Sequence, residues 1–122
     1  MSKATLRSDA EYDIGALALL GVVHARLDQR KQAEQVLALV IPAAENSTAL
    51  SHMHHAQFHI GATLGLLGRK DDAVSWLTKA ADEGYPSYPR SSTDESLAPL
   101  RGYPGYEALL IRTTLMLIEL TR

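Results

Sequence analysis

Four of the five histidines of the chain lie in one short segment, as His52, His54, His55 and His59. If this segment is a helix, His52, His55 and His59 share one face, because they are three and four residues apart. Three imidazole rings on one face could bind zinc, nickel or copper. No carboxylate stands at ligand spacing beside them, and the same residues are also explained as the polar start of a helix or as a pH-sensitive surface. A metal or small-ligand site here is therefore the alternative prediction, and no cofactor is expected.

Residues suited to catalysis are scarce. Asp71 and Asp72 stand together, but the first turn of a helix favours acidic side chains because they complement the helix dipole. Ser91, Ser92 and Thr93 form a hydroxyl-rich loop without an indicated His–Asp partner, and there is no glycine-rich phosphate loop. The absence of cysteine excludes a thiol nucleophile, a thiolate zinc site and disulfides. We therefore expect no catalytic residues and a protein that is not an enzyme.

The composition is that of one globular domain spanning residues 1–122. Hydrophobic residues make up 46% and charged residues 21% of the chain, which argues against disorder. The net charge of −2 makes nucleic-acid binding through bulk electrostatics unexpected. No apolar run approaches the roughly 20 residues that cross a bilayer, and the N-terminus lacks the pattern of a signal peptide. We expect a cytoplasmic protein that binds neither nucleic acid nor membranes.

The spacing of apolar residues predicts an all-α fold, with helices over residues 9–27, 31–41, 48–67, 69–83 and 104–120. Ser8 and Glu11 have the spacing of a capping box at the first helix. Pro42 is expected to end or kink the second helix, because it has no backbone N–H. Thr93 is expected to cap a further short helical turn, and Pro104 suits the start of the last helix. No segment is typical of a strand.

The chain repeats itself at a constant offset of 40 residues, since 61 − 21 = 40. The matching pairs are Leu20-Gly21 with Ile60-Gly61, Leu27 with Leu67, Ala33 with Ala73, and Leu37 with Leu77. A glycine inside a helix costs about 1 kcal/mol relative to alanine, and it is tolerated where a neighbouring helix comes close. Gly21 and Gly61 are therefore predicted to face Ala33 and Ala73 on the following helices.

This pattern resembles the tetratricopeptide repeat, whose usual period is about 34 residues. The residues that carry the resemblance are Gly21, Ala33 and Leu37 in the first unit and Gly61, Ala73, Leu77 and Ala80 in the second. His24 and Val40 depart from the family pattern. The longer period here is expected to come from residues 43–51.

Residues 58–110 are also similar to the closing module of many bacterial tetratricopeptide proteins. The similarity rests on Gly68-Arg69-Lys70-Asp71-Asp72-Ala73, Trp76-Leu77, Gly84-Tyr85-Pro86-Ser87-Tyr88-Pro89, Asp94, Leu97, Leu100-Arg101, Pro104 and Tyr106. The resemblance implies two helical hairpins, over about 9–44 and 48–84, in a right-handed stack, closed by a fold-back segment and a last helix within 85–122. It also implies protein–protein interaction as the class of function.

In proteins of this family the first helix of each hairpin lines a concave face. On this chain the resemblance assigns that groove to Gly15, Ala18, Val22, Ala25, Arg26, His55, Phe58, Ala62 and Gly65. Such a groove could accept a partner helix from another protein or peptide. It could equally be filled by the chain's own C-terminal helix or by another copy.

The C-terminal helix carries two apolar stripes. One stripe is Leu109, Leu110, Met116, Leu117 and Leu120, and the other is Ile111, Leu115 and Ile118. A helix that is apolar on two sides is expected to be covered on both. We predict that Ile111, Leu115 and Ile118 form an oligomer contact and that the protein is a homo-oligomer, the other possibility being that residues 85–103 fold over this stripe.

Overall fold

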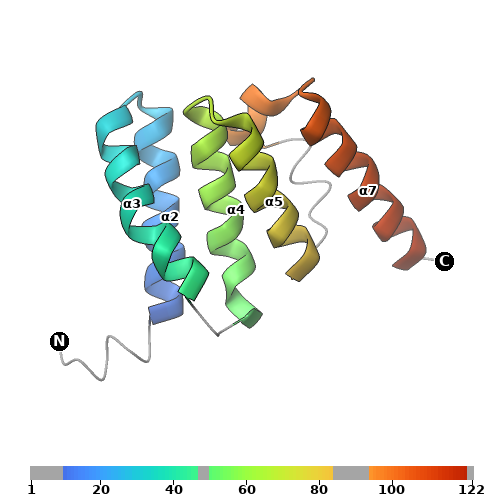
Figure 1. Cartoon of the computed structure of the whole chain (residues 1–122), viewed down its shortest axis with the longest axis horizontal. Coiled ribbons are helices and arrows are strands. Elements are labelled where there is room, and N and C mark those ends of the chain that lie inside the picture. Colours follow the sequence, from blue (N-terminus) through green and yellow to red (C-terminus); the bar gives the residue numbers. More distant parts are fainter. Residues whose placement is uncertain (1–9, 47–49, 84–93, 121–122) are drawn as a thin grey trace.

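The computed structural model describes residues 10–46, 50–83 and 94–120, and these residues form helices joined by short turns (Figure 1). The elements in chain order are α2 (Ala10–Arg26), α3 (Arg30–Asn46), α4 (Leu50–Leu66), α5 (Lys70–Glu83), the 3-10 helix η1 (Glu95–Leu100) and α7 (Pro104–Leu120). No strand occurs in these residues. The all-α class predicted from the sequence is confirmed.

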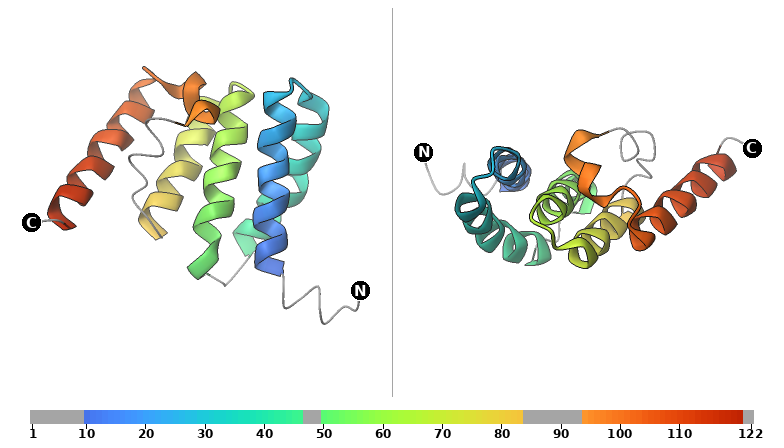
Figure 2. Two further views of the ribbon diagram at one scale, coloured as in Figure 1. Left: turned by 180° about the vertical axis from the view of Figure 1, so that it is seen from behind. Right: turned by 90° about the horizontal axis from the view of Figure 1, so that it is seen from above.

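The helices form two hairpins that stack side by side. Helix α2 pairs with α3 and α4 pairs with α5, while α2 packs directly against α4. Seen from above (Figure 2, right), α2, α4 and η1 form one layer, and α3, α5 and α7 form the other. Helices α2 and α4 run in one direction, and α3, α5 and α7 run in the opposite direction (Figure 1). The closing helix α7 thus lies at one end of the stack and the first hairpin, α2 with α3, at the other (Figure 1).

The turn inside the first hairpin and the turn inside the second have the same backbone geometry, 40 residues apart. Asp28 and Gly68 both adopt the left-handed conformation, with φ of 60° and 88°. Four backbone hydrogen bonds of the first turn recur in the second at the same offset. Their amide donors are Leu27, Asp28, Gln29 and Ala33 in the first turn and Leu67, Gly68, Arg69 and Ala73 in the second. The sequence repeat is therefore also a repeat of structure.

The glycine in the middle of α4 permits the close approach of α5 that the sequence predicts. A Cβ atom on Gly61 would lie 2.8 Å from Cγ of Leu77 and 3.1 Å from the carbonyl oxygen of Ala73. Real Cβ atoms essentially never lie as close as 2.8 Å to another atom, so a side chain at position 61 would require a shift of Leu77 or of the helices.

The corresponding glycine of α2 lies at a similar crossing, but with different neighbours. A Cβ atom on Gly21 would lie 3.1 Å from Val36 of α3 and 3.1 Å from Oγ1 of Thr63 of α4. These residues, and not the predicted Ala33, provide its nearest atoms. Gly21 therefore serves both the hairpin and the contact between hairpins.

Helix α4 is the centre of the fold, since it contacts α2, α3, α5 and η1. Its Ile60 and Thr63 are completely buried. It is apolar around most of its circumference, as suits a helix that is covered on several sides, whereas α3 and α5 are amphipathic. Helices α2 and α7 share the all-round apolar character of α4, although each of them lies at an end of the stack.

Two helix boundaries differ from the prediction. Helix α3 continues through Pro42 as far as Asn46, because Ala44 beyond the proline packs into the core, and the Asn46 side chain donates to the Pro42 carbonyl at 2.8 Å. The helical turn near residue 95 is capped by Asp94, whose side chain accepts a hydrogen bond from the Ser96 amide. The predicted caps Thr93 and Ser8, and the side chain of Glu11, lie outside the described part of the chain.

Candidate interaction surfaces

The inner side of α7 holds this helix against α5. Tyr106 is completely buried, and Thr113, two turns later, is nearly so. At the rim of this contact, a guanidinium nitrogen of Arg112 donates to the carboxylate of Asp82 on α5. Because Pro104 is the first residue of α7, its fixed backbone sets where this packing begins.

Two tyrosines at the start of α7 have raised pKa values. Burial raises the pKa of Tyr106 to about 12. The hydroxyl of Tyr103 donates to Asp71, and this hydrogen bond, followed by partial desolvation and the negative charge of Asp71, raises the pKa of Tyr103. Lys70 lies above the ring of Tyr103, with 5.7 Å from Nζ to the ring centre. Both phenols are therefore neutral below pH 10, and they hold the start of α7 in place through burial and the hydrogen bond to Asp71.

The opposite side of α7 is apolar and exposed to solvent. Ile111, Leu115 and Ile118 are 64%, 58% and 50% exposed, and we call these three residues the α7 outer face. The predicted contact with another copy stays a prediction. Residues 85–93 of the fold-back segment lie outside the described part of the chain, so the alternative that this segment covers the stripe also stays a prediction.

The other predicted stripe of α7 is only partly packed. Leu109 and Leu110 are half-buried and lie against the core, and Met116 and Leu117 are also half-buried. Leu120 is 74% exposed, so its predicted place in a buried stripe is wrong. In Figure 1 the C-terminal end of α7 diverges from α5.

Five of the nine residues assigned to the groove are buried inside the protein. Ala18, Val22, Phe58 and Ala62 belong to the core, and a Cβ atom on Gly65 would lie 3.1 Å from Leu100 of η1. These five residues do not line an open groove, and the prediction is wrong for them. They contact the chain's own neighbouring helices, with η1, rather than the C-terminal helix, covering Gly65.

The remaining residues assigned to the groove are more open. Gly15 and Ala25 are half-buried, while Arg26 and His55 are exposed. They are separated by the buried residues of α2 and α4, so the structure does not bring them together as one surface.

A second exposed apolar surface, which the sequence analysis did not predict, lies on α2. Leu20, Val23 and Leu27, which we call the α2 outer face, are 44%, 45% and 62% exposed. They lie one helical turn apart on the side of α2 that faces away from the rest of the stack. The repeat offers a signal for them, because Leu20 and Leu27 are apolar at the positions that Ile60 and Leu67 occupy in the second unit, where they are buried.

The histidine cluster does not form a metal site among the described residues. No group of three histidine, cysteine, aspartate or glutamate side chains in that part of the chain comes together as metal ligands. The rings of His54 and His55 are 4.2 Å apart, and His59 meets the ring of Phe58 edge-on at 5.8 Å. The side chain of His52 lies outside the described residues.

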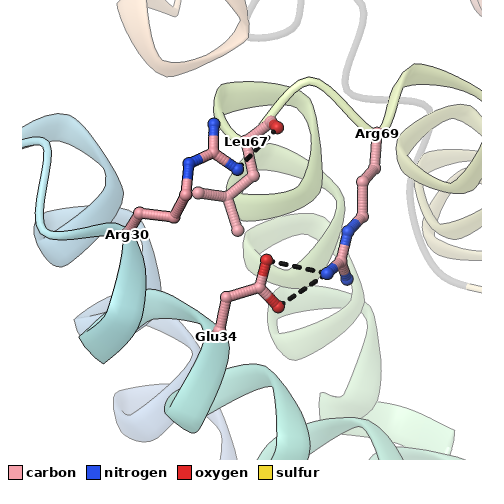
Figure 3. A network of polar contacts seen from close by, with 4 residues as sticks. All are labelled: Arg30, Glu34, Leu67 and Arg69. Atoms are coloured by element: carbon pink, nitrogen blue, oxygen red, sulfur yellow. Dashed lines mark hydrogen bonds and ion pairs between the residues drawn. The ribbon is translucent and has the colours of Figure 1, made fainter.

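A polar network joins the two hairpins on the side of α3 (Figure 3). Arg69 Nη2 donates to both carboxylate oxygens of Glu34, and Arg30 donates to the carbonyl oxygen of Leu67 at 3.1 Å. Next to this network lies an open hollow of about 330 Å³. Its lining consists of Glu34, Leu37, Ala38, Ile41, Pro42 and Arg69. The ion pair at its rim is already satisfied within the chain, so the hollow offers a ligand mainly a shallow apolar wall.

Comparisons with known proteins do not assign the chain to a family. No family model, no curated protein and no solved structure matched it. Within the described residues, no helix combines the length and the apolar character needed to cross a membrane.

Proposed function

We propose that this protein is a small interaction module of the tetratricopeptide type, which binds other proteins rather than catalysing a reaction and which self-associates. The observation that carries the proposal is the α7 outer face. Three large aliphatic side chains at helical spacing are each at least half exposed. A contiguous apolar surface of this kind is typical of an interaction site.

The repeat supports the class of function. The two hairpins with equivalent turns, separated by 40 residues, have the organisation of helical-repeat proteins, which present helix surfaces to partners. Two hairpins are fewer than the three or more repeats that such stacks usually need for stability. Packing against another chain would supply the missing contact.

Burial of the α7 outer face would supply part of the free energy that association requires. Complete burial of one large aliphatic side chain is worth about 1.5–3 kcal/mol. Three such side chains, together with those that they meet on the partner, can offset part of the entropy lost on association. We therefore expect an oligomer that forms in the micromolar range and dissociates on dilution.

Light scattering over a range of concentrations tests the proposal. The wild-type protein should give a species heavier than the 13.3 kDa chain, and the double substitution Leu115→Lys, Ile118→Lys should give a helical monomer by scattering and circular dichroism. Leu39→Lys is the matched control, because Leu39 is 64% exposed but lies on α3, and this variant should associate like the wild type. A wild-type protein that stays monomeric at all concentrations would contradict self-association.

A further inference from the structure

The exposed apolar side chains of the protein are concentrated at the two ends of the stack. Among the described residues, the large apolar side chains that are clearly exposed lie on α2 and its turn or on α7, with Leu39 as the exception. The set is Leu19, Leu20, Val23, Leu27, Leu39, Ile111, Leu115, Ile118 and Leu120. One end of the molecule therefore has the α2 outer face and the other has the α7 outer face.

The repeat indicates what the α2 outer face is built to contact. Forty residues after Leu20 and Leu27 come Ile60 and Leu67, which are 0% and 7% exposed. In α4 these positions are buried because another hairpin, α2 with α3, precedes it and packs against it. The α2 outer face thus has the composition of a surface onto which a further helical layer stacks, and no helix within residues 10–46, 50–83 and 94–120 covers it.

We propose, on the basis of the self-association proposed above, that the α2 outer face binds the α7 outer face of a second copy of the chain, in a head-to-tail stack. A single kind of contact then covers both exposed surfaces. A pairing of α7 with α7 of another copy would leave the α2 outer face exposed.

The directions and spacings of the two helices fit this contact. Helices α2 and α7 run in opposite directions within one molecule (Figure 1), so copies stacked in the same orientation bring them together antiparallel. Read backwards, the α2 outer face has steps of four and three residues, from Leu27 through Val23 to Leu20. Read forwards, the α7 outer face, Ile111, Leu115 and Ile118, has the same steps. The three side chains of each face therefore meet level with one another over seven residues, or about 10 Å.

Charge at the edge of the contact agrees with this alignment. Leu27 and Asp28 belong to the turn that follows α2, and Asp28 is exposed. When Leu27 is level with Ile111, this acidic turn lies near the level of Arg112, whose side chain is 46% exposed. An acid of one copy then lies near a base of the other, beside the carboxylate of Asp82 that Arg112 already contacts.

A mixing experiment tests the head-to-tail contact. One variant carries Leu20→Lys and Val23→Lys and the other carries Leu115→Lys and Ile118→Lys, and circular dichroism verifies that both are helical. Each variant alone should lose association and sediment as a monomer. Each still has one intact face, so their mixture should form a species of twice the monomer mass and nothing larger, while the wild type grows with concentration beyond the dimer.

The outcomes separate this contact from the proposed function. If the α2 variant associates as strongly as the wild type, or if the mixture of helical variants stays monomeric, the head-to-tail contact is refuted. In the first case self-association through α7 still stands. If the wild type itself never associates, the proposed self-association fails as well.

Discussion

Arg69, at the turn before α5, donates through a single nitrogen to both carboxylate oxygens of Glu34 on α3, each at 2.7 Å. This pair joins the second turn to the first hairpin (Figure 3). The two side chains are 46% and 34% exposed, so solvent screens their attraction.

We expect Glu34→Gln and Arg69→Gln each to lower the free energy of unfolding by about 0.3–1 kcal/mol, the usual range for exposed pairs of this kind. The double variant should lose less than the sum of the two single losses. Urea unfolding at low and high salt measures this coupling, which should shrink at high salt. Strictly additive losses at low salt would show that the pair contributes nothing.

Replacing glycine by alanine should have opposite effects on stability in a left-handed turn and inside a helix. Gly68 has a φ of 88°, a conformation that costs a residue with a Cβ atom about 1–2 kcal/mol, so Gly68→Ala should destabilise the protein by about 1 kcal/mol. Gly15 lies inside α2 with no atom within 4 Å of a built Cβ, and Gly15→Ala should stabilise it by about 0.5–1 kcal/mol. Thermal unfolding of the two variants compares these effects, and equal shifts of the melting temperature would contradict this explanation.

The close crossing of α4 and α5 gives a second glycine prediction. Gly61→Ala gains helix propensity of about 1 kcal/mol but forces Leu77 and the Ala73 backbone apart, and overpacking of this kind costs about 1–3 kcal/mol. We expect a net loss of stability in urea unfolding. Gly61→Ala should lower the free energy of unfolding less in a Leu77→Ala background than in the wild-type background. An equal loss in both backgrounds would show that the contact with Leu77 does not cause the destabilisation.

The buried phenol of Tyr106 makes stability depend on pH in the alkaline range. Its pKa is about 12 in the folded protein, against about 10 in the unfolded chain. Below pH 10 the phenol is neutral in both states. Between pH 10 and 12 only the unfolded chain ionises, so stability falls as pH rises, by up to about 2 kcal/mol. Urea unfolding at several pH values should show this fall in the wild type and a smaller one in Tyr106→Phe. Equal falls in both would contradict the assignment.

The positions of the helices followed from the sequence, because the period of the apolar residues and the placement of Gly68 and Pro104 mark helices and their ends. The predicted end of α3 at residue 41 was wrong, because the helix continues through Pro42 to Asn46. A proline removes one hydrogen bond, but packing of the following residues decides whether the helix continues, and this packing depends on α4.

The surfaces were harder to predict. The resemblance places Ala18 and Val22 in a groove, and helical periodicity shows that they share a face, but neither shows which neighbour covers that face. Leu20 and Ile60 occupy equivalent positions in the repeat and differ in exposure only because α4 has a hairpin before it. Exposure at these positions depends on the number of units in the stack, and no local pattern encodes that number.

The central position of α4 also has a consequence for how the molecule opens. Helix α4 contacts α2, α3, α5 and η1, whereas the last helix has α5 as its main neighbour. Amide protons in the middle of α4 can therefore exchange with solvent only when the whole domain unfolds, while those at the end of α7 exchange through local fraying. In a stack of copies this order would change at the junctions, where α7 of one molecule would gain the protection that it lacks alone.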